Sequence, residues 1–343
     1  MKNKPILGIT MGDPAGIGPE IAVKAFGHKD IYKICRPLII GDVSVLSQTA
    51  KLLRSKIKVL SIKNINEAKF HPGTMEVYDL KNVNLKKLKL GKVSAMAGHA
   101  AFEFIKTAIQ LALDNKIDGT VTGPIHKKAI NLAGHHFSGH TEIYAHFTKT
   151  KNYAMMLVEG KMRVIHVTTH VSLRQACDLI KKKRVLDVII LANNACEKLG
   201  IKSPKIAVAG LNPHSSDGGL FGWEEKKEII PAIKAAKKMG INAEGPIPSD
   251  TLFPKTKGGY YDIVVAMYHD QGHIPLKLLG FNWNEKNKKW KSVSGVNITV
   301  GLPIIRVSVD HGTAFDQAGK GTANEESLLS SISYAAAMAA NKE

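Results

Sequence analysis

Short apolar runs rich in β-branched residues alternate with longer segments of helical periodicity along the whole chain. Strands that alternate with helices are typical of βαβ units built around a largely parallel sheet. The pattern therefore predicts an α/β fold. The predicted strands cover residues 5–10, 37–41, 58–62, 119–122, 153–158, 163–168, 205–209, 262–266 and 304–309.

Helix signals lie between these runs. Residues 98–116 carry apolar side chains at 101, 104, 105, 108, 111 and 112, which fall on one face of a helix. Another helix should begin near Pro19, because proline suits a first helical turn. Segments 185–199 and 225–239 are each followed by a glycine that suits a helix C-terminus. Residues 282–294 are rich in Lys and Asn and predict an inserted surface loop or hairpin.

Composition agrees with a folded globular protein. The chain has 343 residues, of which 44% are hydrophobic and 22% charged, and its length allows two domains. Three cysteines without C-x-x-C spacing argue against a disulfide framework and against a cysteine zinc site. No apolar run is long enough for a membrane helix and the start lacks a signal-peptide pattern, so we expect a cytoplasmic protein.

The charge is strongly basic, with 48 Lys and Arg against 29 Asp and Glu, a formal net charge of +19. This excess raises the alternative of a nucleic-acid-binding protein. Only six residues are arginine, however, and the scattered lysines have no interleaved aromatic residues of the kind that single-strand binders use. A lysine-rich solvated surface is the favoured interpretation. Its positive electrostatic potential would attract small anionic substrates.

A glycine-rich turn at residues 11–20 (MGDPAGIGPE) follows the first predicted strand. Strand, turn and helix N-terminus in that order can form an anion site. The dinucleotide fingerprint fails, because Ile21 occupies the third glycine position, and no phosphate-binding loop motif occurs. A purely structural turn and a ligand-binding turn both stay open, and Asp13 at a strand end favours the second.

His170, His214 and His269 each come directly after an apolar strand run. In a parallel sheet all three would lie at one edge, where three imidazoles suit a divalent ion such as Zn²⁺. Their spacing matches no short metal motif, and with 14 histidines in the chain a chance arrangement is the alternative. Asp250 and Asp270 lie in neighbouring motifs and could orient the imidazoles or act as general bases.

Other polar residues suit an anionic ligand. His140 and Thr141 open a predicted helix and offer an imidazole and a hydroxyl. Lys277, Asn297 and Arg306 follow downstream, and Lys with Arg is what a phosphate or carboxylate pocket requires. Arg306 lies inside an apolar strand and should have an anionic partner, either an acidic side chain or a ligand. The glycine-rich segment 309–323 favours a loop over a ligand.

Together these motifs make the chain resemble the family of 4-hydroxythreonine-4-phosphate dehydrogenases, NAD-dependent enzymes of vitamin B6 biosynthesis. The resemblance runs through the whole chain in order, at residues 11–20, 122–124, 139–142, 168–170, 210–214, 249–253, 268–272 and 310–314. It implies an isocitrate/isopropylmalate-dehydrogenase-like fold, with two α/β domains flanking a central cleft, and a homodimer. We place the first domain at 1–128 plus 298–343 and the second at 129–297, with 282–294 inserted.

The resemblance also assigns roles. It implies that a divalent metal, Zn²⁺ favoured over Mg²⁺ or Co²⁺, binds at the dimer interface to ligands from both subunits, namely His170, His214 and His269. Substrate would bind His140, Thr141, Lys277, Asn297 and Arg306. The adenosine part of NAD, favoured over NADP, would contact His311, Gly312 and Thr313. Asp250 or Asp270 would orient a histidine or relay a proton. Residues 215–217 (SSD) depart from the family's usual Ala-Gly-Glu.

The implied reaction is metal-dependent oxidation of 4-phospho-hydroxy-L-threonine to 2-amino-3-oxo-4-phosphooxybutanoate, which decarboxylates to 3-amino-2-oxopropyl phosphate. A paralogous dehydrogenase of 4-phospho-threonate or 4-phospho-erythronate is the alternative within the family. Two further alternatives differ in class: a basic nucleic-acid-binding protein, and a metal-dependent hydrolase whose histidines activate water.

Overall fold

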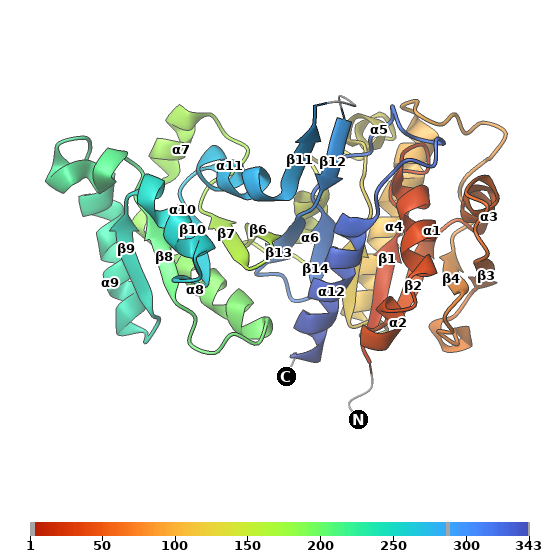
Figure 1. The fold of residues 1–343 in the computed structure, drawn as a ribbon, viewed down its shortest axis with the longest axis horizontal. Coiled ribbons are helices and arrows are strands. Elements are labelled where there is room, and N and C mark those ends of the chain that lie inside the picture. The colour runs from red at the N-terminus through yellow and green to blue at the C-terminus, as the bar shows by residue number, and fades with distance from the viewer. Residues whose placement is uncertain (1–3, 286–288, 342–343) are drawn as a thin grey trace. The chain divides into compact units, whose positions relative to one another are not determined.

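The computed structural model describes residues 4–285 and 289–341. The chain divides into two compact units (Figure 1): unit 1 holds residues 4–150 and 302–341, and unit 2 holds the described residues of 151–301. Unit 1 continues to residue 150, past the expected boundary at 128, because α5 (Lys127–Leu132) and α6 (His140–Phe147) pack on the long helix α4 (Ala95–Leu113).

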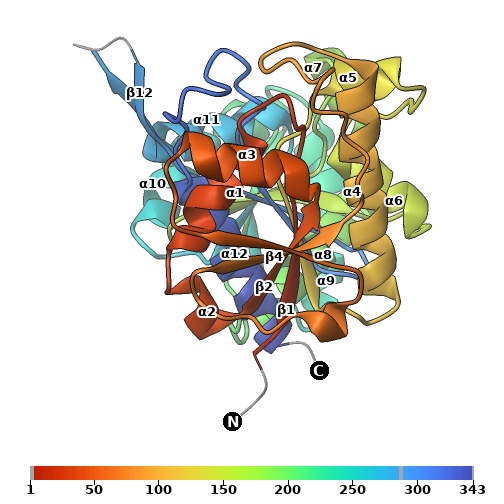
Figure 2. The same ribbon diagram turned by 90° about the vertical axis from the view of Figure 1, so that its right-hand side faces the viewer.

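The sheet of unit 1 is parallel, with strand order β3-β4-β2-β1-β5-β14. Its inner strands β2, β1 and β5 are almost entirely buried, because helices cover both faces of the sheet. Figure 2 shows α4 on one face and α1, α2 and α12 on the other. The elements are β1 (Ile6–Thr10), α1 (Gly18–Gly27), α2 (Ile31–Ile34), β2 (Arg36–Gly41), α3 (Val43–Leu52), β3 (Lys58–Ile62), η1 (Ile65–Glu67), β4 (Thr74–Asp79), β5 (Gly119–Thr122), β14 (Arg306–Val309) and α12 (Glu326–Ala340).

The sheet of unit 2 is mixed, with strand order β13-β6-β7-β10-β8-β9. Strand β6 runs antiparallel to both β13 and β7, whereas β7, β10, β8 and β9 are parallel and end at the same edge. The strands are β6 (Ala154–Glu159), β7 (Met162–His166), β8 (Ile206–Ala209), β9 (Ala243–Ile247), β10 (Ile263–Ala266) and β13 (Val296–Val300). The helical segments are α7 (Leu173–Leu179), α8 (Lys182–Lys198), η2 (Pro213–Gly219), η3 (Glu225–Ile229), α9 (Ile230–Lys238), α10 (Ser249–Lys257) and α11 (His269–Gly280).

The segment expected as an insertion forms a small antiparallel hairpin of β11 (Phe281–Asn284) and β12 (Lys289–Val293). Trp283 and Trp290 are register partners across it, while residues 286–288 lie outside the described residues. The predicted α/β fold class is confirmed. Within residues 4–285 and 289–341, no helix combines the length and the apolar character needed to span a bilayer.

Candidate active site

Three elements of unit 1 meet around Arg306, which is only 2% exposed. Its Nη2 donates a hydrogen bond to Oγ1 of Thr122 on β5 (3.1 Å), and its guanidinium carbon lies 5.7 Å from the ring centroid of Tyr144 on α6. Burial lowers the pKa of Arg306 to about 10, which leaves the side chain charged at neutral pH. Glu142, also on α6, supplies a nearby negative charge that favours the charged form of Arg306. A buried cation beside a hydroxyl and an aromatic ring can in addition take an anionic ligand.

His140, at the first position of α6, belongs to the same cluster. Burial and the nearby charge of Arg306 hold the pKa of His140 well below its usual range, so the imidazole is neutral. Its Nε2 is buried and finds no hydrogen-bond partner in the described part of the chain. Thr141 follows in the first turn. His140, Thr141, Tyr144 and Arg306 are called the anion site below.

Asp13 lies at the end of β1, in the glycine-rich turn, and is fully buried. Its Oδ1 accepts from the Ala15 amide (2.8 Å), whereas Oδ2 has no partner among the described residues. Burial raises the pKa of Asp13 to about 6. Gly12 permits the turn, since it has φ +77° and a Cβ there would lie 2.5 Å from the Pro124 carbonyl oxygen.

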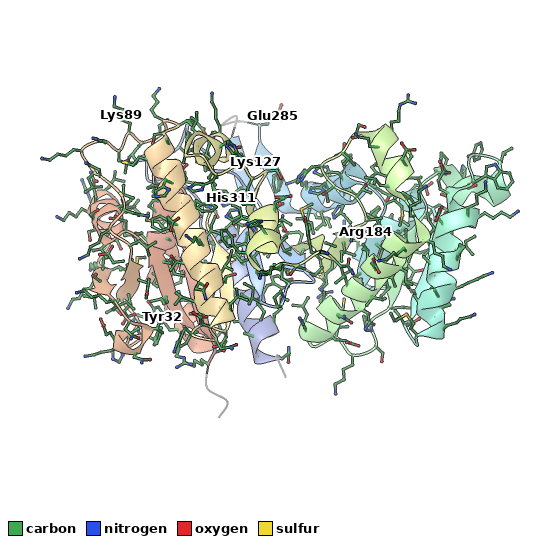
Figure 3. All side chains as sticks on the ribbon, turned by 180° about the vertical axis from the view of Figure 1, so that it is seen from behind. Tyr32, Lys89, Lys127, Arg184, Glu285 and His311 are labelled. Carbon is green, nitrogen blue, oxygen red and sulfur yellow. The ribbon has the colours of Figure 1, made fainter. Side chains whose placement is uncertain are left out.

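The loop after β14, which carries His311, Gly312 and Thr313, docks on this turn (Figure 3 marks His311). The Ile17 amide donates to the Thr313 carbonyl (3.0 Å), and the Gly319 amide donates to Oε1 of Glu20 (2.6 Å). Gly312 is exposed, and a Cβ built there would meet nothing within 4 Å. The three residues predicted to contact the dinucleotide therefore lie on an anchored loop with open space at its glycine.

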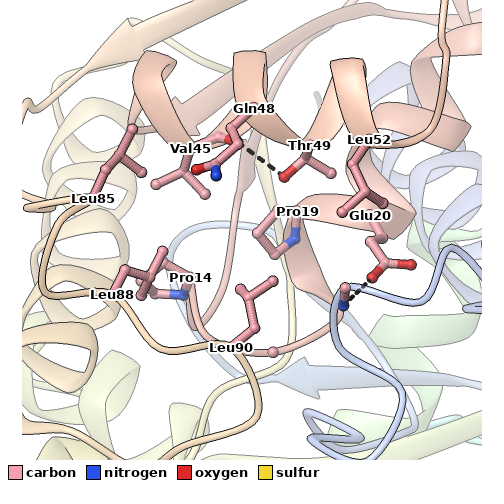
Figure 4. Close-up of a pocket in the computed structure, with 12 residues that line it drawn as sticks. Pro14, Pro19, Glu20, Val45, Gln48, Thr49, Leu52, Leu85, Leu88 and Leu90 are labelled. Carbon is pink, nitrogen blue, oxygen red and sulfur yellow. Dashed lines mark hydrogen bonds between the residues drawn. The ribbon is translucent and has the colours of Figure 1, made fainter.

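A cavity of about 80 Å³ lies beside this anchor (Figure 4). Its walls are largely apolar and include Leu52, Leu85, Leu88 and Leu90, with Glu20 at one side. Ligand sites usually occupy at least roughly 300 Å³, so this cavity is too small for a nucleotide.

The second cluster belongs to unit 2. His170 follows β7 and His269 opens α11 after β10, and their ring centroids lie 5.8 Å apart. Because zinc–nitrogen bonds are about 2.1 Å long, two rings at this separation can reach one ion. Nδ1 of His269 lies 2.6 Å from Oδ1 of Asp270, so the ring donates there and keeps its lone pair on Nε2, as a metal ligand requires. A pocket of about 380 Å³ opens beside His170, His269, Asp270 and Tyr268.

His214 does not join these two histidines. It lies in η2 with its ring 6.4 Å from that of Phe221, and residues 214–217 all have positive φ, between 42° and 74°. Buried Glu225 fixes this loop by accepting from the Leu211 and Asn212 amides (2.8 and 2.7 Å). The part of the chain that the structure describes holds no group of three or more His, Cys, Asp or Glu suited to a metal ion. The three histidines follow parallel strands that end at one edge, as expected, but within the described residues of a single chain they do not form one metal-binding group.

The sequence analysis missed two histidines that support the pair. The ring of His273 stacks on that of His269 with centroids 3.6 Å apart, and His166 lies behind His273. Burial lowers the pKa of His166 to about 3 and that of His273 to about 4, so both are neutral. The signal was present in the i, i+4 spacing of His269 and His273 on a predicted helix. His166, His170, His269, His273 and Asp270 are called the histidine site below.

The remaining predicted residues are spread over unit 2. Nζ of Lys277, on α11, lies 4.2 Å from the ring centroid of Phe281, and Asn297 is half-buried on β13. Asp250 is exposed at the start of α10, where its Oδ1 accepts from the Thr251 amide (2.9 Å). Of the two predicted acids, Asp270 is therefore the one in contact with a histidine of the predicted metal site.

Comparisons with known proteins agree with this architecture. A D-threonate 4-phosphate dehydrogenase from Cupriavidus necator is 47% identical, covering 98% of both chains. A crystal structure titled 4-hydroxythreonine-4-phosphate dehydrogenase from Klebsiella pneumoniae superposes with a TM-score of 0.86 at 43% identity, covering 98% of this chain and 100% of that one. A second structure of that title, from Burkholderia phymatum, gives 0.85 at 43% identity, covering 98% and 99%.

These relatives are named as dehydrogenases of phosphorylated hydroxy acids, which confirms the predicted enzyme class, an oxidoreductase acting on a CH–OH group. The family model described as "Pyridoxal phosphate biosynthetic protein PdxA" matches residues 33–335. The chain therefore belongs to the PdxA family.

Proposed function

We propose that this chain oxidises the C3 hydroxyl of a four-carbon hydroxy acid phosphorylated at C4, with NAD as hydride acceptor and a divalent ion as cofactor. The observation that carries the proposal is the anion site, in which buried, charged Arg306 and neutral His140 lie together. A phosphate or carboxylate would repay the desolvation of that cation.

D-threonate 4-phosphate is the favoured substrate, because the relative of that name is 47% identical whereas the structures titled for hydroxythreonine phosphate are 43% identical. 4-Phospho-hydroxythreonine, the substrate that the motif resemblance puts first, is the second candidate on account of those structures. The two substrates differ at C2, which carries a hydroxyl in one and an amino group in the other.

Either product is a 3-oxo acid, and the new ketone can hold the electron pair that remains when CO₂ leaves. Threonate phosphate would then give dihydroxyacetone phosphate, and hydroxythreonine phosphate would give 3-amino-2-oxopropyl phosphate.

His170 and His269 would bind the divalent ion, with Zn²⁺ favoured over Mg²⁺ or Co²⁺. Because His214 does not join them within one chain, we assign the third ligand to His214 from a second copy in a homodimer. When bound, a divalent ion lowers the pKa of a substrate hydroxyl and stabilises negative charge on oxygen. Asp270 would hold Nδ1 of His269 protonated, so that Nε2 points its lone pair outward.

Arg306 would donate to the phosphate, and His140 and Thr141 would donate to neighbouring oxygens. Lys277 and Asn297 are the further substrate residues of the proposal. His311, Gly312 and Thr313 would contact the adenosine of NAD, and the loop that bears them is already held by Glu20 and Ile17. An anchored loop loses little conformational entropy when a ligand binds.

The test is NADH formation by purified, metal-reconstituted protein with each of three substrates: D-threonate 4-phosphate, D-erythronate 4-phosphate and 4-phospho-hydroxythreonine. Each assay is run with and without a chelator. We expect chelator-sensitive turnover, fastest with D-threonate 4-phosphate. Preference for the amino substrate would restore the first expectation, and turnover that a chelator leaves intact would refute the metal role. Sedimentation analysis tests the homodimer.

A further inference from the structure

We infer that His273, backed by His166, is a positioning residue that fixes the imidazole of His269 in the proposed metal site. The inference rests on the proposed function, since it assigns His269 as a metal ligand. Neither His273 nor His166 belongs to the motifs that predict the metal site.

The imidazole rings of His269 and His273 are in direct contact. The rings of His269 and His273 are stacked, with centroids 3.6 Å apart and planes 13° apart. They are four residues apart on α11, so the helix backbone sets their separation. The side chain of His269 is 38% exposed, so its imidazole could rotate on the solvent side. The stacked ring of His273 limits that rotation. Asp270 holds Nδ1 of the same ring, so His269 is restrained at one face and at one nitrogen.

The hydrogen bonds then fix which nitrogens carry protons. Nδ1 of His166 faces the Met155 carbonyl oxygen (3.3 Å), which can only accept, so His166 donates from Nδ1 and keeps a lone pair on Nε2. Nδ1 of His273 lies 3.2 Å from that Nε2 and 2.9 Å from the His269 carbonyl oxygen. Two acceptors facing one nitrogen require that Nδ1 of His273 be the donor. The His269 carbonyl oxygen can only accept, so the backbone fixes the tautomer of His273.

Gly272 leaves space for the imidazole of His166 beside α11. A Cβ at Gly272 would lie 2.4 Å from Nε2 of His166 and 2.7 Å from Cγ1 of Val164. Glycine at this position lets the buried imidazole approach α11 and reach His273. The chain of imidazoles ends at a backbone carbonyl, which cannot pass a proton on. The arrangement thus suits orientation of His269 rather than proton transfer.

The experiment compares binding of Zn²⁺ and Co²⁺ by calorimetry in wild type, H273L, H273F and the control H71L, which changes an exposed histidine of unit 1. H273L removes both the stack and the donor, whereas H273F keeps an aromatic ring and loses the donor. We expect H273L to weaken binding about 10–100-fold, the usual effect of losing a residue that supports a ligand. H273F should weaken it less, and H71L should leave it unchanged. The visible spectrum of the Co²⁺ protein reports ligand geometry and should change in H273L.

Melting of the metal-free proteins separates a local effect from loss of fold. If H273L does not fold, H273Q takes its place, because glutamine can still donate to the His269 carbonyl but cannot stack. Binding by H273L or H273Q within twofold of wild type overturns this inference alone. Absence of binding by the wild type overturns the proposed metal site, and the inference with it.

Discussion

The anion site and the histidine site differ in how far the chain completes them. Arg306 is 2% exposed and contacts Thr122 of β5 and Tyr144 of α6. The side chains of His269 and Asp270 are 38% and 68% exposed, and one predicted ligand is missing from the cluster. The cation of the anion site is thus buried before any ligand binds, whereas the histidine site stays open to solvent and to a further ligand. The contrast gives four predictions.

The largest effect is expected from R306M. It removes the charge that we assign to the phosphate, so kcat/KM should fall about 10³-fold, roughly 4 kcal/mol, mainly through KM. Stability should change little, because the substitution removes the desolvation of the cation together with its hydrogen bond to Thr122 and its attraction to Glu142. Steady-state kinetics and urea unfolding measure both. R54M makes the same charge change at an exposed position and serves as control. An unchanged KM in R306M would remove Arg306 from the substrate site.

D13N tests a second buried ionisable side chain of unit 1. Because the pKa of Asp13 is raised to about 6 from 3.8, the folded protein favours the neutral acid. The neutral carboxyl therefore contributes to the free energy of unfolding below about pH 4, and this contribution is lost as the pH rises through about 6. The change in the free energy of unfolding is about 3 kcal/mol at most. Asparagine cannot ionise and still accepts from Ala15. D13N should thus be more stable than wild type at pH 7.5 and similar at pH 4, by urea unfolding. If the free energies of unfolding of wild type and D13N changed equally with pH, the raised pKa of Asp13 would be refuted.

D270N should have a smaller effect, in unit 2. The amide can turn its oxygen toward Nδ1 of His269 but has no charge, so metal affinity should fall about tenfold. Calorimetric titration with Zn²⁺ measures this, and D250N is the matched control because Asp250 contacts its own neighbour's amide. A larger loss in D250N would reverse the roles of the two acids.

The smallest effect is expected at Tyr144. Y144L removes the ring beside Arg306 and should raise KM about 2–10-fold, the range of a cation–aromatic contact. Y144F keeps the ring and should leave KM within about twofold. Equal KM values for Y144L and wild type would show that Arg306 is positioned by Thr122 without the ring.

The α/β class was predictable because β1, β5, β8 and β10 are short buried runs between long helical patterns. Strand β9 was not predicted, since its sequence AEGPI contains glycine and proline, which weaken strand propensity. Strands β6 and β7 were both predicted, but their antiparallel pairing was not. Only two residues separate the two strands, and so short a connection joins antiparallel strands in a hairpin.

The sites show the same division. Proximity of His170 and His269 followed from their place after parallel strands that pair in the sheet. The separate position of His214 did not, because four consecutive positive φ values at non-glycine residues have no sequence signal. The roles of His166 and Gly272 were equally hidden, since their contact joins residues far apart in the chain.

Gly272 bears on how substitutions in this family should be interpreted. It has no side chain to bind or react, yet any Cβ there would overlap His166. A mutational scan scored by activity would place Gly272 among the most intolerant positions, together with residues that touch substrate. Loss of activity on substitution of this glycine would reflect a steric clash with the imidazole of His166, and no contact with substrate. Tolerance of substitutions at the nearby exposed residue Ile274 would show that the clash is confined to the buried face of α11.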